Sequence, residues 1–198
     1  MNENISNKPD KGITIYCGSS EGNDLRFAEA AAIVGTETAR RGLTLYYGGG
    51  KMGLMEVAGR ACRAAGGRTC AIIPQFMVER GWNDPESSET VITADMHERK
   101  GLMAAKAIGA IAMPGGVGTF EELTELITWR QLGLFSGNIV ILNIARYYDS
   151  MLNQFDAAIE AGFLPADHIQ LFSVTENPAV AVAMASAEPQ SLNLHRKF

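Results

Sequence analysis

Short apolar runs alternate along the chain with longer stretches in which apolar side chains recur every three or four residues. A continuous apolar run that ends at glycine or proline is typical of a strand buried on both faces. Apolar side chains at three- and four-residue steps indicate a helix with one buried face. Strands are predicted at residues 13–17, 43–47, 69–73, 90–93, 110–113, 138–142 and 170–174. Helices are predicted at residues 24–41, 52–65, 96–108, 121–134, 147–161 and 178–185.

The alternation of strand and helix predicts an α/β fold. Strands without a polar side belong to a mostly parallel sheet that helices cover on both faces, which gives a doubly wound, Rossmann-like domain of three layers. We expect a single domain over residues 12–187, with loose tails at residues 1–11 and 188–198. The connection at residues 75–90 contains Gly81, Trp82 and Pro85 and is expected to be irregular.

Three glycine-rich segments follow predicted strands. They are Gly18-Ser19-Ser20, Gly48-Gly49-Gly50 and residues 115–119. In doubly wound folds, ligands bind beyond the carboxyl ends of the strands. The three segments are therefore expected at one edge of the sheet, around a ligand site.

Composition and charge narrow the classes of function. The 198 residues carry a net charge of −5, which argues against nucleic-acid and anionic-membrane binders because these cluster Lys and Arg against phosphates. A small phosphorylated ligand stays compatible with this charge. The scattered Cys17, Cys62 and Cys70 favour buried reduced thiols over disulfides or a zinc site. No apolar run approaches the ~20 residues of a membrane span, and the N-terminal residues are polar, so we expect a cytoplasmic protein.

Residues 114–119 have the features of a phosphate-binding turn. Backbone N–H groups and the positive dipole end at a helix start attract phosphate, glycines allow close approach, and the Thr119 hydroxyl adds a donor. The segment matches neither the dinucleotide fingerprint nor the P-loop. A structural alternative exists, because Thr119 and Glu122 have the spacing of a capping box, which satisfies a helix start without a ligand.

Two cations stand at the start of the helix predicted at residues 96–108. Asp95 and Glu98 have capping-box spacing, which places Arg99 and Lys100 in the first turn. Positive charge there opposes the helix dipole. The two cations either serve a site or belong to a solvated charged face.

Several motifs occur in a fixed order along the chain. They are Cys17-Gly18-Ser19-Ser20, Tyr47-Gly48-Gly49-Gly50 with Gly53-Leu54-Met55, Met96-His97-Glu98-Arg99-Lys100, Pro114-Gly115-Gly116-Val117-Gly118-Thr119-Phe120-Glu121-Glu122, and Ile127-Thr128-Trp129 with Gln131-Leu132-Gly133. With these motifs, residues 12–175 resemble the LONELY GUY family of cytokinin riboside monophosphate phosphoribohydrolases. The glycine motif paired with the upstream Arg-Lys is highly specific. Members are often labelled lysine decarboxylases, a label that nothing in this sequence supports.

The resemblance implies hydrolysis of the N-glycosidic bond of an adenosine 5'-monophosphate, as in an AMP nucleosidase, with release of the base and ribose 5-phosphate. It implies a homodimer with the active site near the subunit interface, and neither a metal nor an organic cofactor. Arg99 and Glu122 match the catalytic arginine and glutamate of the family. The implied substrate-binding residues are Ser19, Ser20, Glu79, Met96, Lys100, Gly115, Gly116, Val117, Gly118, Thr119 and Glu121.

The expected roles follow from the chemistry of a ribosyl bond. Glu122 faces the developing positive charge or the attacking water, and a neighbouring Arg99 is expected to keep it ionised by lowering its pKa. Arg99 itself either helps the base to leave or orients the ribose and Glu122. A non-catalytic nucleotide carrier or sensor of the same fold, which needs neither residue, is the alternative function.

Base specificity is expected to depend on residues 75–90, where the sequence departs from the family pattern. Family members often carry an acidic residue in this connection, and Glu79 is the nearest candidate. Plain AMP and a prenylated adenosine monophosphate both stay open as substrates. Away from the site, His168 is expected at the surface, and Leu134 on the buried face of the helix at residues 121–134.

Overall fold

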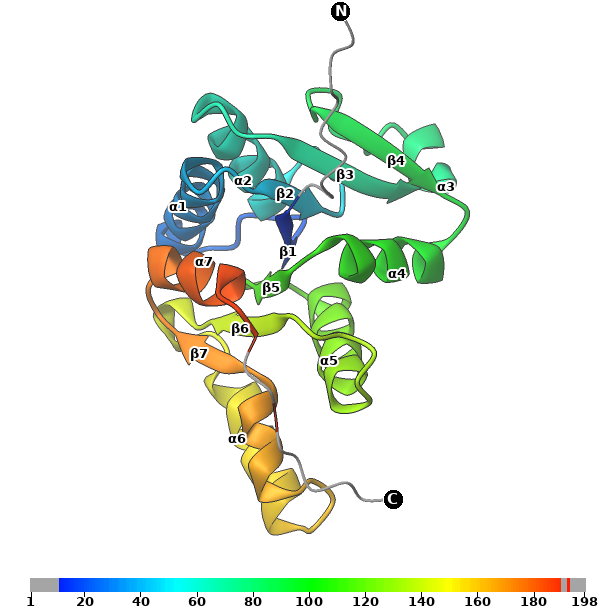
Figure 1. The fold of residues 1–198 in the computed structure, drawn as a ribbon. Coiled ribbons are helices and arrows are strands. Elements are labelled where there is room, and N and C mark those ends of the chain that lie inside the picture. Colours follow the sequence, from blue (N-terminus) through cyan, green and yellow to red (C-terminus); the bar gives the residue numbers. More distant parts are fainter. Residues whose placement is uncertain (1–10, 190–191, 193–198) are drawn as a thin grey trace, which may run out of the picture.

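The chain folds around a seven-stranded sheet with the strand order β4-β3-β2-β1-β5-β6-β7 (Figure 1). The computed structural model describes residues 11–189 and residue 192. Every neighbouring pair of strands is parallel. The strands are β1 (Gly12–Tyr16), β2 (Thr44–Tyr47), β3 (Thr69–Pro74), β4 (Glu89–Thr93), β5 (Gly109–Ala112), β6 (Asn138–Leu142) and β7 (Ser173–Thr175).

Helices cover both faces of the sheet, which gives the three layers of the predicted doubly wound α/β fold and confirms that class. One face carries α1 (Leu25–Arg40), α2 (Gly53–Ala64) and α7 (Pro178–Ser186). The opposite face carries α4 (Met96–Lys106), α5 (Val117–Gln131) and α6 (Asp149–Glu160). Shorter elements are α3 (Gln75–Glu79), η1 (Ile144–Arg146) and η2 (Ala166–Leu171).

The central strands are buried on both faces, which explains their continuous apolar sequence. In β1, Ile13 and Ile15 join the core beneath α1 and α2, whereas Tyr16 joins the core on the opposite face. Burying one such aliphatic side chain contributes about 1.5–3 kcal/mol to folding. A polar residue at either kind of position would lose this contribution.

The switch point of the topology lies between β1 and β5. These strands are neighbours in the sheet, but the chain leaves them in opposite directions, so a crevice opens beyond their carboxyl ends. The Gly18 N–H donates to the Pro114 carbonyl across the crevice (3.0 Å), and the Leu54 N–H donates to the Gly18 carbonyl (3.1 Å). The loops after β1, β2 and β5 therefore meet at one edge, as predicted.

Several predicted elements differ from those observed. Residues 75–79, expected to be irregular, form the short helix α3. Helix α5 begins at Val117 instead of residue 121 and ends at Gln131, so Leu134 lies beyond it and is 72% exposed instead of buried. Glycines are poor helix formers, which made Gly118 read as part of a turn. The helix nevertheless includes Gly118 in its first turn.

The C-terminal region holds two further differences. Residues 170 and 171 belong to η2, and β7 begins only at Ser173. His168 is 2% exposed, and both of its ring nitrogens lack a hydrogen-bond partner among the described residues. Its expected surface position was wrong because η2 packs against α5, a contact between distant parts of the chain.

Other expectations concern the chain as a whole. The predicted tails fall outside the described residues, apart from residues 11, 188, 189 and 192. Cys17, Cys62 and Cys70 are buried, as predicted, and no disulfide joins them. In the described part of the chain, no helix has the length and apolar character to cross a membrane. The same residues contain no group of three or more His, Cys, Asp or Glu side chains placed to hold a metal ion.

Candidate active site

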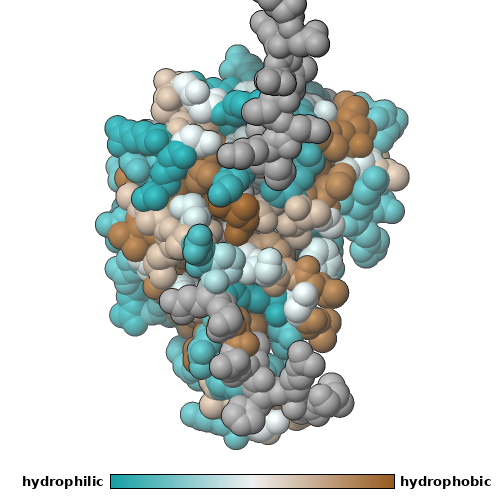
Figure 2. Space-filling model, viewed as in Figure 1, coloured by the Kyte–Doolittle hydropathy of each residue, from teal (hydrophilic) through white to brown (hydrophobic). Residues whose placement is uncertain are grey.

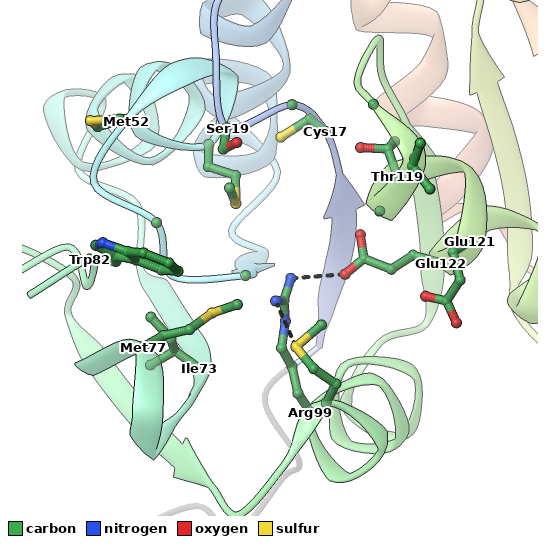
Figure 3. A pocket seen from close by; sticks show the side chains of 18 of the residues that line it. Cys17, Ser19, Met52, Ile73, Met77, Trp82, Arg99, Thr119, Glu121 and Glu122 are labelled. Carbon is green, nitrogen blue, oxygen red and sulfur yellow. Dashed lines mark hydrogen bonds and ion pairs between the residues drawn. The ribbon is translucent and has the colours of Figure 1, made fainter. Parts of the chain in front are cut away.

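A cavity of about 690 Å³ lies at the carboxyl edge of the sheet and has two unlike halves (Figure 3). We call its two sides the charged half and the apolar half. The charged half consists of Met96, Arg99, Glu121, Glu122 and residues 116–119. The apolar half consists of Met52, Met55, Ile73, Met77 and Trp82.

A buried ion pair forms the centre of the charged half. The Arg99 Nη2 atom donates to Glu122 Oε1 at 2.8 Å, and the two residues are 7% and 8% exposed. Arg99 stands in the first turn of α4, whose N-terminus is capped by the Asp95 carboxylate through the N–H groups of His97 and Glu98. The capping role of Asp95 is confirmed. The alternative that Arg99 belongs to a solvated charged face was wrong, because its side chain is buried beside the cavity.

Burial raises the pKa of Glu122, and the attraction of Arg99 opposes the rise without reversing it. The expected lowering of this pKa was therefore wrong. Removing a carboxylate from water disfavours its charged form more strongly than one neighbouring cation favours it here. Glu121 adds repulsion in the same direction as burial. A carboxylate in this state takes up a proton more readily than one in solvent.

The Arg99 guanidinium is held against the loop after β2. A Cβ atom on Gly48 would overlap Nη2 of Arg99 and lie 3.0 Å from its Cζ. On the other side, Nη1 lies 3.6 Å from the Met96 sulfur. The Nε atom is buried and has no partner among the described residues. The side chain is thus fixed in place from two sides.

Lys100 is buried and does not line the cavity. Its Nζ atom contacts the Glu121 carboxylate and lies 2.9 Å from Glu125 Oε2. Burial alone would lower its pKa, but the two carboxylates reverse that effect and raise it. The alternative of a solvated charged face was wrong for Lys100 as well, because this residue is also buried. Through Glu121, which lines the cavity, Lys100 supports the charged half from behind.

The turn before α5 leaves its N–H groups open. The N-cap residue is Gly116, and no described side chain caps this helix. Thr119 lies in the first turn instead of at the N-cap, and Glu122 pairs with Arg99. The capping-box alternative for Thr119 and Glu122 was therefore wrong. First-turn N–H groups lack intrahelical acceptors and, with the helix dipole, favour an anion.

Glycine is required at the positions of this turn for two different reasons. A Cβ on Gly115 would overlap Thr119 Oγ1 and lie 2.8 Å from the Gly18 nitrogen. A Cβ on Gly116 or Gly118 would meet no described atom within 4 Å. Gly115 is therefore needed for packing, whereas Gly116 and Gly118 leave open space beside the donors.

The apolar half depends on a loop that is hydrogen-bonded to the glycine segment after β2. The Lys51 N–H donates to the Trp82 carbonyl (3.0 Å), and the Asp84 N–H to the Gly49 carbonyl (2.8 Å). The buried Asp84 carboxylate accepts hydrogen bonds from Tyr47 Oη (2.7 Å) and Arg63 Nη1 (2.9 Å). This network fixes the loop that carries Trp82.

The Trp82 side chain has a further contact outside the cavity. The Arg80 guanidinium lies 5.1 Å from the centre of the Trp82 ring and 5.4 Å from that of Phe76. A guanidinium over an aromatic face is attracted by the ring quadrupole. Arg80 thereby helps to hold the indole at the mouth of the cavity, opposite Arg99 and Glu122 (Figure 3).

Cys17 lines the cavity from the end of β1. Burial raises the pKa of its thiol, and the nearby Glu122 adds to the rise. A nucleophilic cysteine must be a thiolate. Cys17 is therefore a wall of the site and does not serve as a nucleophile at neutral pH.

Most of the predicted site residues gather around the cavity, and four do not line it. Those that line it are Arg99, Glu122, Ser19, Met96, Gly116, Val117, Gly118, Thr119 and Glu121. Those outside the lining are Ser20, Glu79, Lys100 and Gly115. Glu79 is exposed on α3 and accepts a hydrogen bond from Gln75 (3.1 Å). From the connection at residues 75–90, Met77 and Trp82 reach the cavity instead.

Residues 75–90 were expected near the base, and Met77 and Trp82 come from this connection, but neither side chain was singled out. Met52, Met55 and Ile73 were not assigned to the site. Met55 occurred in one of the motifs, and Gly81 and Trp82 stood out in the connection at residues 75–90. Neither feature of the sequence indicates that a side chain reaches the cavity. For Trp82, this depends on bonds that Asp84 and Lys51 make with distant parts of the chain.

The chain is similar to known proteins over most of its length. A family model described as "Possible lysine decarboxylase" matches residues 55–184. An Arabidopsis thaliana cytokinin riboside 5'-monophosphate phosphoribohydrolase is 42% identical over 154 residues, which cover 78% of this chain and 72% of the relative. A probable enzyme of the same name from Oryza sativa subsp. japonica is 40% identical over 159 residues, covering 80% and 71%.

Solved structures of the same fold include more distant proteins. The molybdenum cofactor carrier protein from Chlamydomonas reinhardtii superposes with a TM-score of 0.66 at 19% identity. The match covers 89% of this chain and 94% of the carrier. At this level of identity the likeness concerns the fold alone.

Proposed function

Because the chain belongs to the LONELY GUY family of cytokinin riboside 5'-monophosphate phosphoribohydrolases, we propose that it hydrolyses the N-glycosidic bond of adenosine 5'-monophosphates. The observation that carries the proposal is the position of the buried Arg99–Glu122 pair. It lies between the open N–H groups of α5 and the apolar half of the cavity. A nucleoside monophosphate has the matching order of parts: phosphate, ribosyl bond and base.

The substrate would lie across both halves of the cavity. The 5'-phosphate takes the first-turn N–H groups at Val117, Gly118 and Thr119, together with the Thr119 hydroxyl. The base takes the apolar half, where Trp82 offers an aromatic face. The anomeric carbon then lies beside the Glu122 carboxylate.

Hydrolysis replaces a C–N bond by a C–O bond at the anomeric carbon. Water supplies the oxygen, and one of its protons ends on the departing base. The transition state resembles an oxocarbenium ion, so a nearby carboxylate stabilises it. The raised pKa of Glu122 also suits it to take the proton from water, because proton transfer is most efficient when the pKa lies near the working pH.

Arg99 has two groups of donors for two tasks. Its Nη2 atom orients Glu122, and its Nη1 atom, which makes only a 3.6 Å contact with the Met96 sulfur, would donate to an oxygen or nitrogen of the substrate. In the second task it would assist the base to leave or hold the ribose. A carrier protein of the same fold has no need of this pair, since binding alone requires only the phosphate turn and the apolar half.

We propose that a prenylated adenosine monophosphate is a better substrate than plain AMP. The apolar half contains three methionines beside Trp82, and methionine side chains adapt to irregular apolar groups. The deciding experiment incubates the protein with AMP and with isopentenyladenosine monophosphate and measures kcat/KM by release of free base. Binding of either nucleotide without release of base would support the carrier and contradict the hydrolase.

The homodimer and the cytoplasmic location stay predictions. Exposed apolar side chains occur on the edge strand β4, at Ile92, and beyond α5, at Leu132 and Leu134. The face in Figure 2 shows apolar areas between hydrophilic ones near β4 and near α5. Such side chains suit a subunit contact, and light scattering of the purified chain measures whether a dimer forms.

A further inference from the structure

The turn before α5 keeps its carbonyl oxygens engaged by donors. The Pro114 carbonyl accepts from the Gly18 N–H (3.0 Å), and the Gly116 carbonyl accepts from the Phe120 N–H (3.1 Å). The carbonyl between them, that of Gly115, accepts from the hydroxyl of Tyr147. A carbonyl oxygen facing a phosphate would repel it, so an anion site needs its carbonyls directed elsewhere.

The bond from Tyr147 has a consequence for the next residue. A trans peptide unit is planar, with its C=O and N–H on opposite sides. Fixing the Gly115 carbonyl toward Tyr147 therefore fixes the Gly116 N–H in the opposite direction. Gly116 lines the cavity, whereas Tyr147 does not. Tyr147 thus acts on the cavity from outside, through a single peptide plane.

Tyr147 is presented by a strained turn. It follows Ala145 and Arg146, whose φ angles of 55° and 61° are left-handed and unfavourable for residues with a Cβ. The turn is secured by Asp149, which accepts from Asn143 Nδ2 (2.8 Å) and Arg146 Nε (2.6 Å). Strain of this kind persists where the surroundings over-determine it, and it often marks a functional position.

Aromatic contacts hold the Tyr147 ring. Its centroid lies 5.7 Å from that of Phe27, 6.3 Å from that of Phe120 and 5.2 Å from that of Tyr148. The ring position therefore does not depend on the hydroxyl. A change that removes only the hydroxyl isolates the bond to Gly115.

We propose that Tyr147 is a positioning residue for the 5'-phosphate of the substrate. By holding the Gly115 carbonyl away from the cavity, it aligns the Gly116 N–H and the donors that follow it. The proposal rests on the proposed function, which places a phosphate at this turn. It assigns a task in substrate binding to the loop after β6, none of whose residues lines the cavity.

The neighbouring tyrosine provides a matched control. Tyr148 donates to the Met113 carbonyl at 2.7 Å, a bond of the same type that lies before the turn. Tyr148 is buried, so losing its hydroxyl leaves a buried carbonyl without its donor. Tyr148→Phe is therefore expected to lower the melting temperature without a selective effect on phosphate.

The experiment measures binding of ribose 5-phosphate and of adenine to the full chain by calorimetry. For Tyr147→Phe, the dissociation constant of ribose 5-phosphate should rise about five- to tenfold, as expected for one lost hydrogen bond. That of adenine should not change. In hydrolysis, the variant should raise KM for the nucleotide and change kcat little. Tyr148→Phe should leave the ratio of the two dissociation constants at the wild-type value.

Several results would overturn the proposal. Unchanged ribose 5-phosphate affinity in Tyr147→Phe, or an equal loss for both ligands, contradicts a phosphate-positioning role. A wild-type chain that binds ribose 5-phosphate but hydrolyses no nucleotide refutes the proposed hydrolysis, and the ratio of the dissociation constants still decides the role of Tyr147. A wild-type chain that does not bind ribose 5-phosphate refutes both.

Discussion

The charged half and the apolar half of the cavity are built in different ways. The charged half comes from the first turns of α4 and α5, and its central ion pair is buried between two helices. The apolar half comes from the start of α2, the end of β3, the short helix α3 and the loop that follows it. Helices fix their side chains by regular backbone bonds, whereas this loop depends on a few bonds from Asp84 and Lys51.

This difference separates two properties of the proposed enzyme. Chemistry depends on the charged half, where a small displacement changes the position of reacting atoms. The choice of base depends on the apolar half, where contact area and adaptable side chains matter more than exact placement. Variants that displace the Arg99–Glu122 pair should therefore act on kcat, whereas variants in the apolar half, like those that disturb the phosphate turn, should act on KM.

The largest effect is expected from Glu122→Gln. Loss of the carboxylate should reduce kcat on the order of 100-fold or more. Folding raises the pKa of Glu122, so its contribution to stability is present below its unfolded pKa and is lost as the pH rises through the folded one. The substitution also leaves the buried Arg99 guanidinium without its charged partner, which is destabilising, so the melting temperature of the variant at pH 7 should fall.

The matched control for this variant is Glu125→Gln on the same helix. Glu125 pairs with Lys100 and does not line the cavity, so its loss should change kcat little. Equal losses of kcat in both variants would contradict the role given to Glu122.

The second-largest effect is expected from one of two glycines in the loop after β2. Gly48→Ala should displace the Arg99 guanidinium and lower kcat roughly 10- to 100-fold, because a misplacement of about 1 Å has effects of this size. In Gly50→Ala, the new Cβ would lie 2.9 Å from the Met55 Cε atom, in the apolar half. That variant should act mainly on KM, and steady-state kinetics on both variants tests the separation of the two halves.

The third effect is a pH dependence that belongs to the charged half alone. If the ionised form of Glu122 is required, kcat/KM should fall tenfold per pH unit below its pKa. Because that pKa is raised, the fall should begin above the ordinary glutamate value of about 4.3. The residual activity of Glu122→Gln should lack this limb, whereas Trp82→Ala should keep it. A wild-type profile that stays flat down to pH 4 would show that Glu122 does not titrate in this way.

The smallest effect is expected from Trp82→Ala. Stacking of a base on an aromatic side chain contributes ~1–3 kcal/mol, and the lower end applies to Trp82 because it is 48% exposed. KM should therefore rise about five- to tenfold, with little change in kcat. The inhibition constant of ribose 5-phosphate, which has no base, should stay at the wild-type value. An equal rise for ribose 5-phosphate would mean that Trp82 supports the charged half as well, and the two halves would not be separate.

The charged half was largely predictable because its residues lie in contiguous motifs. The structure brings Arg99 and Glu122 into contact, since parallel strands bring successive loops to one edge. The sign of the pKa shift of Glu122 was wrong because it depends on how completely the pair is buried, and the sequence does not contain that depth. The start of α5 was misplaced because Gly118 has a low helix propensity.

The apolar half was hardly predictable. The Lys51 N–H holds the backbone of Trp82, and Tyr47 and Arg63 hold its loop by donating to Asp84. The members of each of these pairs are distant in sequence. Local propensity and periodicity contain no information on such pairs. The acidic side chain expected there, Glu79, lies on an exposed part of α3 for the same reason.

The order of the two halves along the chain also bears on how such enzymes change during evolution. Every residue of the apolar half precedes the end of β4 at Thr93, and every residue of the charged half follows it. A single genetic crossover near residue 94 would therefore join the base-selecting segment of one family member to the bond-cleaving segment of another. Substrate preference can in this way be inherited separately from the reaction.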